Sequence, residues 1–388
     1  MSVLAAVMPA PRVPVEIREF PEPDLPPGGA LLKTAFSEVC GTDVHLWHGR
    51  LAGVPYPIIP GHVTTGTLDK AHGPLRDVLG VALQEGDRLA FFDVHRTCGR
   101  CLACTAHRTP TRCLSRRVYG ITDSASEGLF GGWAQKVYLE PGVIIAKMPD
   151  SVTFEAYIGG GCGLLTSVHI IERAQIRLGD TVVVQGAGAV GLCTAALARK
   201  SGAGRVIVVG APTDRLALAR DMGADDVIDI DATESEARWQ RVVDLTNGVG
   251  ADVVVEAAGS PRAFEEGLRM ARNGGAYVIA GHYTNTGDST INAHEHINRK
   301  HLDIRGCWGS EVGHFLRALR ALERYGAEIP FARIGARTFG LGQLNEALEL
   351  AGALQIPKAL VDPWGSDRGQ TGVRPGSDRG STGVRPPH

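Results

Sequence analysis

Residues 182–191 read VVVQGAGAVG and are followed by the helical pattern LCTAALARK at residues 192–200. Gly186, Gly188 and Gly191 form a G-x-G-x-x-G pattern between an apolar strand and a helix, which is the context of a dinucleotide-binding turn. Gly186 permits the tight turn, Gly188 lets the backbone approach a pyrophosphate, and Gly191 allows helix and strand to pack closely. The helix N-terminus, which includes Val190, offers free N–H groups to the anion. The alternative is a glycine-rich turn with a structural role only.

Apolar stretches with helical segments between them surround this motif. Uninterrupted apolar strands of this kind predict a parallel sheet that helices cover on both faces, so we expect a doubly wound cofactor domain over residues 164–308. A further strand is predicted at 302–309, and amphipathic helices at 315–325 and 344–351. The expected strands of the sheet are 181–185, 205–209, 226–230, 251–257 and 276–280.

The end of the second strand of this sheet bears on the choice of cofactor. An acid there favours NAD, because a carboxylate bonds the ribose hydroxyls and repels a 2′-phosphate. This strand ends at Gly210 instead, which admits either cofactor. Thr213 and Arg215 could contact a phosphate, whereas Asp214 would oppose one. NAD and NADP both stay open, with Gly210 and Arg215 as candidate cofactor-binding residues.

Length and charge narrow the class of protein. The chain has 388 residues, which favours two domains, and 40 Lys and Arg against 42 Asp and Glu give a net charge of -2. No global field therefore favours nucleic acid or an anionic membrane. The opening MSVLAAVMPAP lacks the basic start of a secretion signal and is interpreted as a strand. We expect a cytoplasmic protein with no membrane or nucleic-acid partner.

The flanking regions differ from the cofactor domain. Residues 1–163 contain short apolar runs separated by Pro and Gly, which predicts an irregular β domain. Residues 309–362 are expected to return to it. Residues 363–388 contain an 11-residue repeat, GSDRGQTGVRP followed by GSDRGSTGVRP, with too few apolar residues to offset the entropy of ordering. We predict a disordered tail; a basic binding arm is the alternative.

Four of the eight cysteines form one cluster. Cys98, Cys101, Cys104 and Cys113 follow the pattern C-x2-C-x2-C-x8-C. Four thiolates suit a closed tetrahedral zinc site, which leaves no position for substrate and therefore points to a structural role. A thiol redox loop is the alternative, and His107 could replace one thiolate.

Three further candidate ligands are far apart in the sequence. They are Cys40, His62 and Cys162. Each taken singly fits a buried cysteine or a core histidine, but together they would form a Cys2His site with an open fourth position for water or an alcohol. The spacing alone does not show that they converge.

Taken together, these motifs resemble the zinc-dependent medium-chain alcohol dehydrogenases over residues 1–362. The resemblance implies a GroES-like β domain, a Rossmann cofactor domain and an active site between them. It assigns catalytic zinc to Cys40, His62 and Cys162, and structural zinc to the four-cysteine lobe. The sequence departs from the family pattern at two points. Val63 replaces the acid of the family's G-H-E, and eight residues instead of seven separate Cys104 from Cys113.

The resemblance also implies the catalytic residues. Thr42 would take the proton of the alcohol and pass it through the cofactor ribose to His45, while Asp43 would orient a zinc-bound histidine. The expected reaction is reversible hydride transfer between an alcohol and NAD(P). Residues 39–61 and 305–310 resemble members that act on cyclic or polyhydroxy secondary alcohols. A zinc-independent quinone or enone reductase and a non-catalytic cofactor-binding protein are the alternatives.

Oligomeric state is another implication of the resemblance. Family members pair their cofactor domains edge to edge, which predicts a homodimer or homotetramer. The candidate contact is the strand at residues 305–309.

Overall fold

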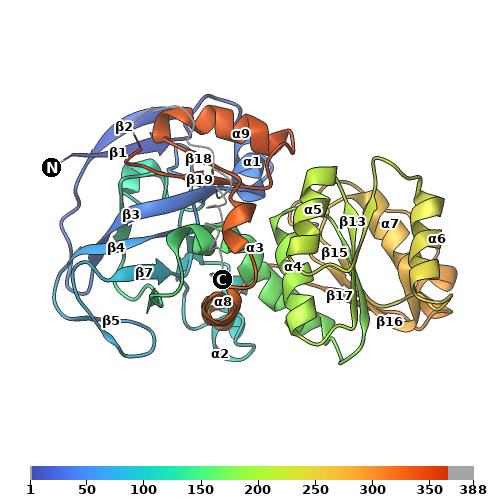
Figure 1. Ribbon diagram of the computed structural model, residues 1–388. Helices are drawn as coiled ribbons and strands as arrows, with labels where there is room; N and C mark the ends of the chain where they lie inside the picture. The colour runs from blue at the N-terminus through green and yellow to red at the C-terminus, as the bar shows by residue number, and fades with distance from the viewer. Residues whose placement is uncertain (1, 366–388) are drawn as a thin grey trace, which may run out of the picture.

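A computed structural model describes residues 2–365 and contains two parts side by side, a β-rich domain and a sheet covered by helices (Figure 1). One chain thus contains a mostly antiparallel sheet and a separate parallel sheet, which confirms the predicted fold class, GroES-like plus Rossmann. No helix within residues 2–365 is long and apolar enough to cross a membrane.

The β-rich domain is built on one large sheet. Within the described chain it has seven strands in the order β11-β7-β4-β3-β19-β18, with β10 also paired to β3. The last two strands come from the C-terminal end, so red and blue segments lie together in Figure 1. The bounds are β3 (Ala30–Val39), β4 (Thr64–Ala71), β7 (Arg88–Phe91), β10 (Lys136–Leu139), β11 (Ile145–Lys147), β18 (Arg337–Phe339) and β19 (Ala359–Val361).

Smaller elements complete this domain. The predicted first strand is present as β1, and its buried side chains pack with Trp133 and Phe339 in one apolar cluster. Three antiparallel pairs are β1 (Ser2–Val7) with β2 (Glu16–Pro21), β5 (Leu75–Arg76) with β6 (Ala82–Leu83), and β8 (Val94–Arg96) with β9 (Arg117–Val118). The helices are α1 (Gly41–Trp47), α2 (Leu102–Thr105) and α9 (Leu344–Gly352).

The second sheet is parallel throughout. Its order among the described strands is β14-β13-β12-β15-β16-β17, so the chain starts in the middle and reverses direction beside β12. Val182 and Val184 join one apolar cluster and Val183 another, because both faces of β12 are covered. The strands are β12 (Thr181–Gln185), β13 (Arg205–Gly210), β14 (Asp226–Asp229), β15 (Ala251–Glu256), β16 (Ala271–Ile279) and β17 (Asp303–Gly306), and the helices are α4 (Ala189–Lys200), α5 (Thr213–Asp221), α6 (Ser235–Leu245) and α7 (Pro261–Met270).

Two helices lie where the domains meet. Helix α3 (Phe154–Ala174) contacts α4 of the cofactor domain and β3 of the β-rich domain, and α8 (Val312–Tyr325) packs against α3. Helix α3 is kinked at Gly161, whose φ of 45° and ψ of -140° are not helical. Because α3 crosses the predicted limit between residues 163 and 164, the domain limits stay predictions.

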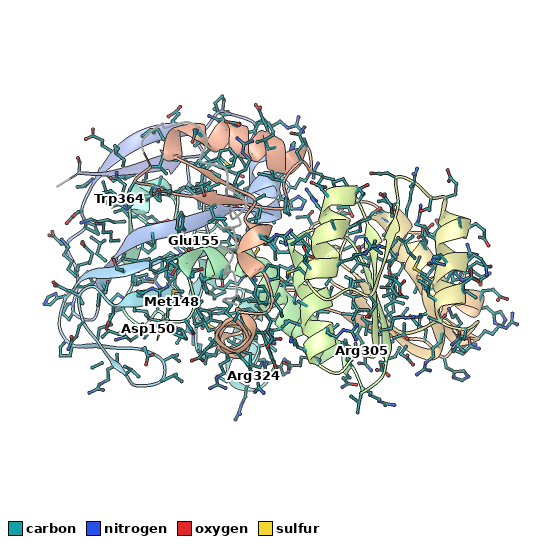
Figure 2. The ribbon with its side chains drawn as sticks, in the orientation of Figure 1. Met148, Asp150, Glu155, Arg305, Arg324 and Trp364 are labelled. Atoms are coloured by element: carbon teal, nitrogen blue, oxygen red, sulfur yellow. The ribbon has the colours of Figure 1, made fainter. Side chains whose placement is uncertain are left out.

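The predicted tail begins too early. Trp364 donates from Nε1 to the carbonyl of Thr34 at 2.9 Å, and the ammonium of Lys33 lies 5.1 Å from the centre of its ring. Residues 363–365 are thus packed against the β-rich domain, where Figure 2 labels Trp364. The prediction of disorder was wrong for these three residues because it took no account of an aromatic anchor. The repeat beyond residue 365 lies outside the described residues.

Candidate active site and metal centres

A cleft of about 440 Å³ opens between the two domains. It is lined from the β-rich domain by Cys40, Thr42, His45, His62 and Cys162, and from the cofactor domain by the dinucleotide turn. The predicted catalytic and metal-binding residues therefore line the same cavity as the predicted cofactor-binding turn. This position, beyond the carboxyl ends of the parallel strands where the strand order reverses, is where open α/β sheets bind ligands.

Cys40, His62 and Cys162 come together at the base of this cleft. Cys40 caps the N-terminus of α1, His62 follows the turn at Gly61, and Cys162 directly follows the kink of α3. The sulfur atoms of Cys40 and Cys162 lie 3.7 Å apart. The carboxylate of Glu38 joins the cluster, and one ligand atom from each of the four residues lies within 4.8 Å of the others.

The electrostatics of the cluster favour a cation. The hydrogen bond between the two thiols raises the pKa of Cys40 well above its usual value and lowers the pKa of Cys162 well below it. Burial alone would lower the pKa of His62, but Cys162 raises it to about 10. A buried thiolate beside further acidic groups needs a positive partner, and thiolate with imidazole is the donor set that zinc prefers.

Distances also fit a metal. Tetrahedral zinc with Zn–S bonds of about 2.3 Å places two sulfur ligands roughly 3.8 Å apart. The observed separation of 3.7 Å between Cys40 and Cys162 matches this value and is too long for a disulfide.

The residues predicted to move the proton lie on α1. Thr42 and His45 are one helical turn apart and both line the cleft. Nδ1 of His45 is buried with no hydrogen-bond partner in residues 2–365, and burial lowers the pKa of this ring below 6.5. Asp43 accepts a hydrogen bond from the amide of Cys40 at 2.9 Å. No hydrogen bond joins Asp43 to His62 in the described chain, so the orienting role of Asp43 stays a prediction.

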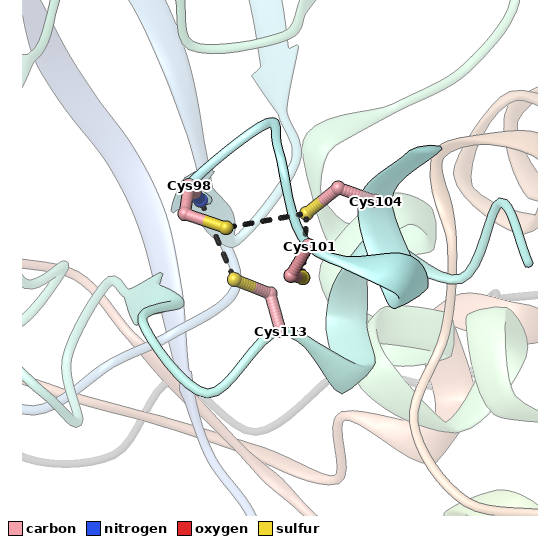
Figure 3. Close-up of side chains that lie close together, drawn as sticks. All are labelled: Cys98, Cys101, Cys104 and Cys113. Atoms are coloured by element: carbon pink, nitrogen blue, oxygen red, sulfur yellow. Dashed lines mark hydrogen bonds between the residues drawn. The ribbon is translucent and has the colours of Figure 1, made fainter. Parts of the chain in front are cut away.

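The second cluster lies in a lobe between β8 and β9. Figure 3 shows the side chains of Cys98, Cys101, Cys104 and Cys113 pointing toward one centre. The sulfur of Cys104 lies 4.0 Å from that of Cys98 and 3.5 Å from that of Cys101. These separations bracket the roughly 3.8 Å expected around tetrahedral zinc. The sulfur of Cys113 lies within 4.8 Å of the other three, so the extra residue before it does not remove it from the cluster.

The lobe contacts the segment that links β17 to α8. The amide and hydroxyl of Thr111 both donate to the carboxylate of Glu311, which precedes α8. Arg112 donates to the carbonyl of Trp308, and its guanidinium lies 4.8 Å from the centre of the indole ring. The four-cysteine lobe thus helps to position Trp308, which lines the cleft.

The dinucleotide turn has the expected geometry. A Cβ on Gly191 would lie 1.9 Å from the carbonyl oxygen of Gly186, and one on Gly186 would lie 2.8 Å from the carbonyl oxygen of Ala257. A Cβ on Gly188 would meet no protein atom within 4 Å, because Gly188 faces the cleft. Two glycines therefore permit close packing, whereas the third leaves space for a ligand beside the N-terminus of α4, where Val190 also lines the cleft.

The cofactor-specificity candidates are engaged with protein groups. A Cβ on Gly210 would lie 2.9 Å from Ala187, so this position has no room for a side chain. The guanidinium of Arg215 is buried and donates to the carbonyl of Leu354, while the hydroxyl of Thr213 donates to Asp229 at 2.7 Å. Arg215 still lines the cleft. These contacts do not discriminate between NAD and NADP.

Sequence reasoning missed three residues of the site. Glu38 belongs to the first cluster, and Tyr283 and Trp308 form a stacked pair with ring centres 5.9 Å apart on the wall of the cleft. Tyr283 also lies 6.4 Å from the ring of His45. The only feature of the sequence that could have identified Glu38 as a site residue is its position two residues before Cys40. The aromatic pair follows strands β16 and β17, whose ends face the cleft.

Comparison with known proteins shows the family. The model of the alcohol dehydrogenase GroES-like domain matches residues 26–150, and that of zinc-binding dehydrogenases matches residues 189–324. The 5-exo-hydroxycamphor dehydrogenase of Pseudomonas putida is 33% identical over 351 residues, which cover 90% of this chain and 95% of that protein. The probable D-xylulose reductase A of Aspergillus terreus is 31% identical and covers 69% of this chain and 73% of its own length.

Solved structures agree. An alcohol dehydrogenase from Thermotoga maritima superposes with a TM-score of 0.89 at 31% identity, covering 93% of this chain and 99% of that one. A putative zinc-binding dehydrogenase from Sinorhizobium meliloti, solved with NADP, gives 0.81 at 26% identity, with 94% and 100% covered. The chain belongs to the zinc-dependent medium-chain dehydrogenase family. It is an NAD(P)-dependent alcohol oxidoreductase with zinc and a nicotinamide dinucleotide as cofactors.

Proposed function

We propose that the chain oxidises a secondary alcohol to a ketone reversibly, with Cys40, His62 and Cys162 holding the catalytic zinc and the four-cysteine lobe holding a structural zinc. The observation that carries this proposal is the convergence of these three residues, with a sulfur separation of 3.7 Å, in the cleft that also contains the dinucleotide turn. When bound, zinc supplies a Lewis acid that makes an alcohol hydroxyl more acidic, and NAD(P) supplies the hydride acceptor.

The residues of the chain transfer the proton and bind the cofactor. Thr42 accepts the proton of the alcohol, and His45, on the same face of α1, passes it toward solvent. The lowered pKa of His45 keeps its ring neutral and able to accept a proton near pH 7. Gly188 and Val190 border the pyrophosphate in the cleft, and Gly186 and Gly191 permit the tight turn that brings them there. The two domain walls exclude water from the reacting atoms.

The substrate we propose is a cyclic or polyhydroxy secondary alcohol. The relatives named for hydroxycamphor and xylulose support this class. The lining of the cleft favours the cyclic, less polar members, because Leu51, Val54 and Ile121 line it together with the Tyr283 and Trp308 pair. Apolar side chains bind a hydrocarbon ring by burying its surface but leave the extra hydroxyls of a polyol without partners.

A substrate profile tests this class. Values of kcat/KM are measured with NAD and with NADP for a bicyclic secondary alcohol, a cyclitol and a linear pentitol. We expect turnover of secondary alcohols, with the bicyclic compound ahead of the pentitol. A preference for primary alcohols, or no turnover of any alcohol, would contradict the proposal.

We further propose that the protein forms a homodimer or homotetramer through the edge of the cofactor sheet. Strand β17 is the last strand in the order of that sheet and has no partner on its outer side within residues 2–365. Light scattering of the purified protein measures the mass directly. An Arg305→Pro change at this edge should shift the mass toward that of the monomer, and an unchanged mass would exclude this edge.

A further inference from the structure

The carboxylate of Glu38 has one bonded and one unbonded oxygen. Its side chain is fully buried in β3, and Oε2 accepts a hydrogen bond from the ammonium of Lys358. Oε1 lies 3.5 Å from Nε2 of His62 and has no hydrogen-bond partner within the described chain. A buried carboxylate oxygen without a donor is costly, so this atom needs a partner that the protein itself does not provide.

Lys358 and the kink of α3 hold this carboxylate in place. Nζ of Lys358 also lies 3.2 Å from the carbonyl oxygen of Ile158 and 3.4 Å from that of Gly160, in the turn where the kink interrupts the helix. A Cβ at Gly161 would lie 2.1 Å from both Oε2 of Glu38 and Nζ of Lys358. The kink therefore makes room for the ion pair and at the same time turns Cys162 toward the cluster.

We propose that Glu38, positioned by Lys358, is a displaceable fourth ligand of the cation held by Cys40, His62 and Cys162. This inference rests on the proposed catalytic metal site. The four ligand atoms lie within 4.8 Å of one another, as in a four-coordinate site. Glu38 can stay paired to Lys358 through Oε2 while it offers Oε1 to the cation. The open position that an alcohol needs is then filled by the protein until substrate arrives.

Val63 occupies the position directly after His62. The side chain of Val63 is apolar and buried, so the residue after His62 cannot supply a carboxylate to the cluster. Glu38 supplies one from the neighbouring strand instead. A pairing of this kind predicts that Glu38 and Lys358 act together, because removal of the acid leaves a buried ammonium without its partner.

The test measures metal release and coordination instead of turnover. Zinc release to a chromogenic chelator and the visible spectrum of the cobalt-substituted protein are compared for wild type, Glu38→Gln and the double variant Glu38→Gln/Lys358→Met, which removes both buried charges. Glu22→Gln is the matched control, because Glu22 also pairs with lysines, Lys70 and Lys136, but lies outside both metal clusters.

We expect the cleft zinc to leave roughly 10–100 times faster in both Glu38 variants, with a shifted cobalt spectrum, while the lobe zinc and the Glu22→Gln protein behave as in wild type. If Glu38→Gln does not fold, the double variant decides. Release within twofold of wild type and an unchanged spectrum would overturn the role of Glu38 alone. A wild-type protein whose only zinc is in the lobe would overturn the proposed catalytic metal site as well.

Discussion

The sulfur atoms of Cys40 and Cys162 lie 3.7 Å apart although 122 positions separate the two residues in the chain. Cys40 starts the first helix of the β-rich domain, and Cys162 lies in the helix that leads into the cofactor sheet. Their contact therefore fixes the base of the cleft at the point where the domains meet. A cation bound there stabilises both the site and the relative position of the elements around it.

Two glycines of the dinucleotide turn should respond differently to the same substitution. Gly188→Ala adds a methyl group to open space, so we expect normal folding stability. The methyl group would hold the pyrophosphate away from the backbone, and loss of one hydrogen bond to a charged group costs about 1.5–3 kcal/mol. We therefore expect the Kd for NAD(P) to rise roughly tenfold or more. Gly191→Ala forces a methyl group against the carbonyl of Gly186 and should cost about 1–3 kcal/mol of folding free energy.

Titration calorimetry with NAD and NADP and denaturant unfolding measure the two effects separately. A Gly188→Ala protein that binds both cofactors as wild type does would show that this residue does not face the pyrophosphate.

The parallel sheet and the shape of the glycine-rich turn at residues 186–191 were predictable from sequence because both have local signals. Val182, Val183 and Val184 are apolar without alternation, which is what burial on both faces requires, and the spacing of the glycines follows from backbone packing within one strand and one helix. The predicted strands differ from the observed ones mainly at their ends, since several stop one residue earlier or later than the apolar run.

Glu38 and Lys358 were not predictable in the same way. Their pairing depends on the C-terminal strand β19 lying beside β3 and on the kink at Gly161, and neither arrangement has a local signal. Trp308 was also missed, because its place in the cleft and its contact with Arg112 of the cysteine lobe join segments that are far apart in the sequence. These contacts are set by tertiary structure, not by the residues next to them in sequence.

Removal of one lobe cysteine should lower the thermal stability of the protein but leave the metal site in the cleft intact. Cys104→Ser is expected to release one zinc per chain, lower the Tm by several degrees and leave the cleft zinc bound, because the two clusters share no ligand. Metal analysis and thermal unfolding give both readouts. Cys193→Ala, a buried cysteine outside both clusters, is the control and should retain both zincs. Full zinc content in Cys104→Ser would exclude the lobe as a metal site.

His45 should give alcohol oxidation a pH dependence below neutrality. Burial lowers its pKa below 6.5, and only the neutral ring accepts a proton, so kcat should fall as pH drops through this lowered pKa. His45→Asn is expected to be slower by roughly 10²-fold near pH 7 and to lose this acid limb. Steady-state rates of both proteins between pH 5 and 8 provide the measurement. An acid limb that persists unchanged in His45→Asn would assign the titration to another group.

His314 should make folding stability sensitive to acid. Burial, with His169 stacked 4.4 Å away, lowers its pKa to about 4, while Nδ1 accepts the amide of Glu311 at 2.8 Å. In the unfolded chain the His314 ring takes up a proton near pH 6.5, whereas in the folded chain it stays neutral down to about pH 4. The contribution of His314 to the free energy of unfolding is therefore complete above pH 6.5. It falls between pH 6.5 and 4, by at most about 1.4 kcal/mol per pH unit.

His314→Asn keeps an acceptor for the amide of Glu311 but cannot titrate. Denaturant midpoints measured from pH 7 to 4 should therefore fall less steeply in this variant than in wild type. Parallel slopes would show that His314 does not contribute to acid sensitivity.

The most direct test of the account is the rate of NAD(P) reduction by a secondary alcohol in zinc-loaded wild type and in Cys40→Ser. Loss of this proposed zinc ligand removes several kcal/mol of transition-state stabilisation, so we predict a rate at least about 10³-fold lower, with NAD(P) binding retained. Equal rates in the two proteins would contradict a zinc-dependent alcohol oxidation at this cleft.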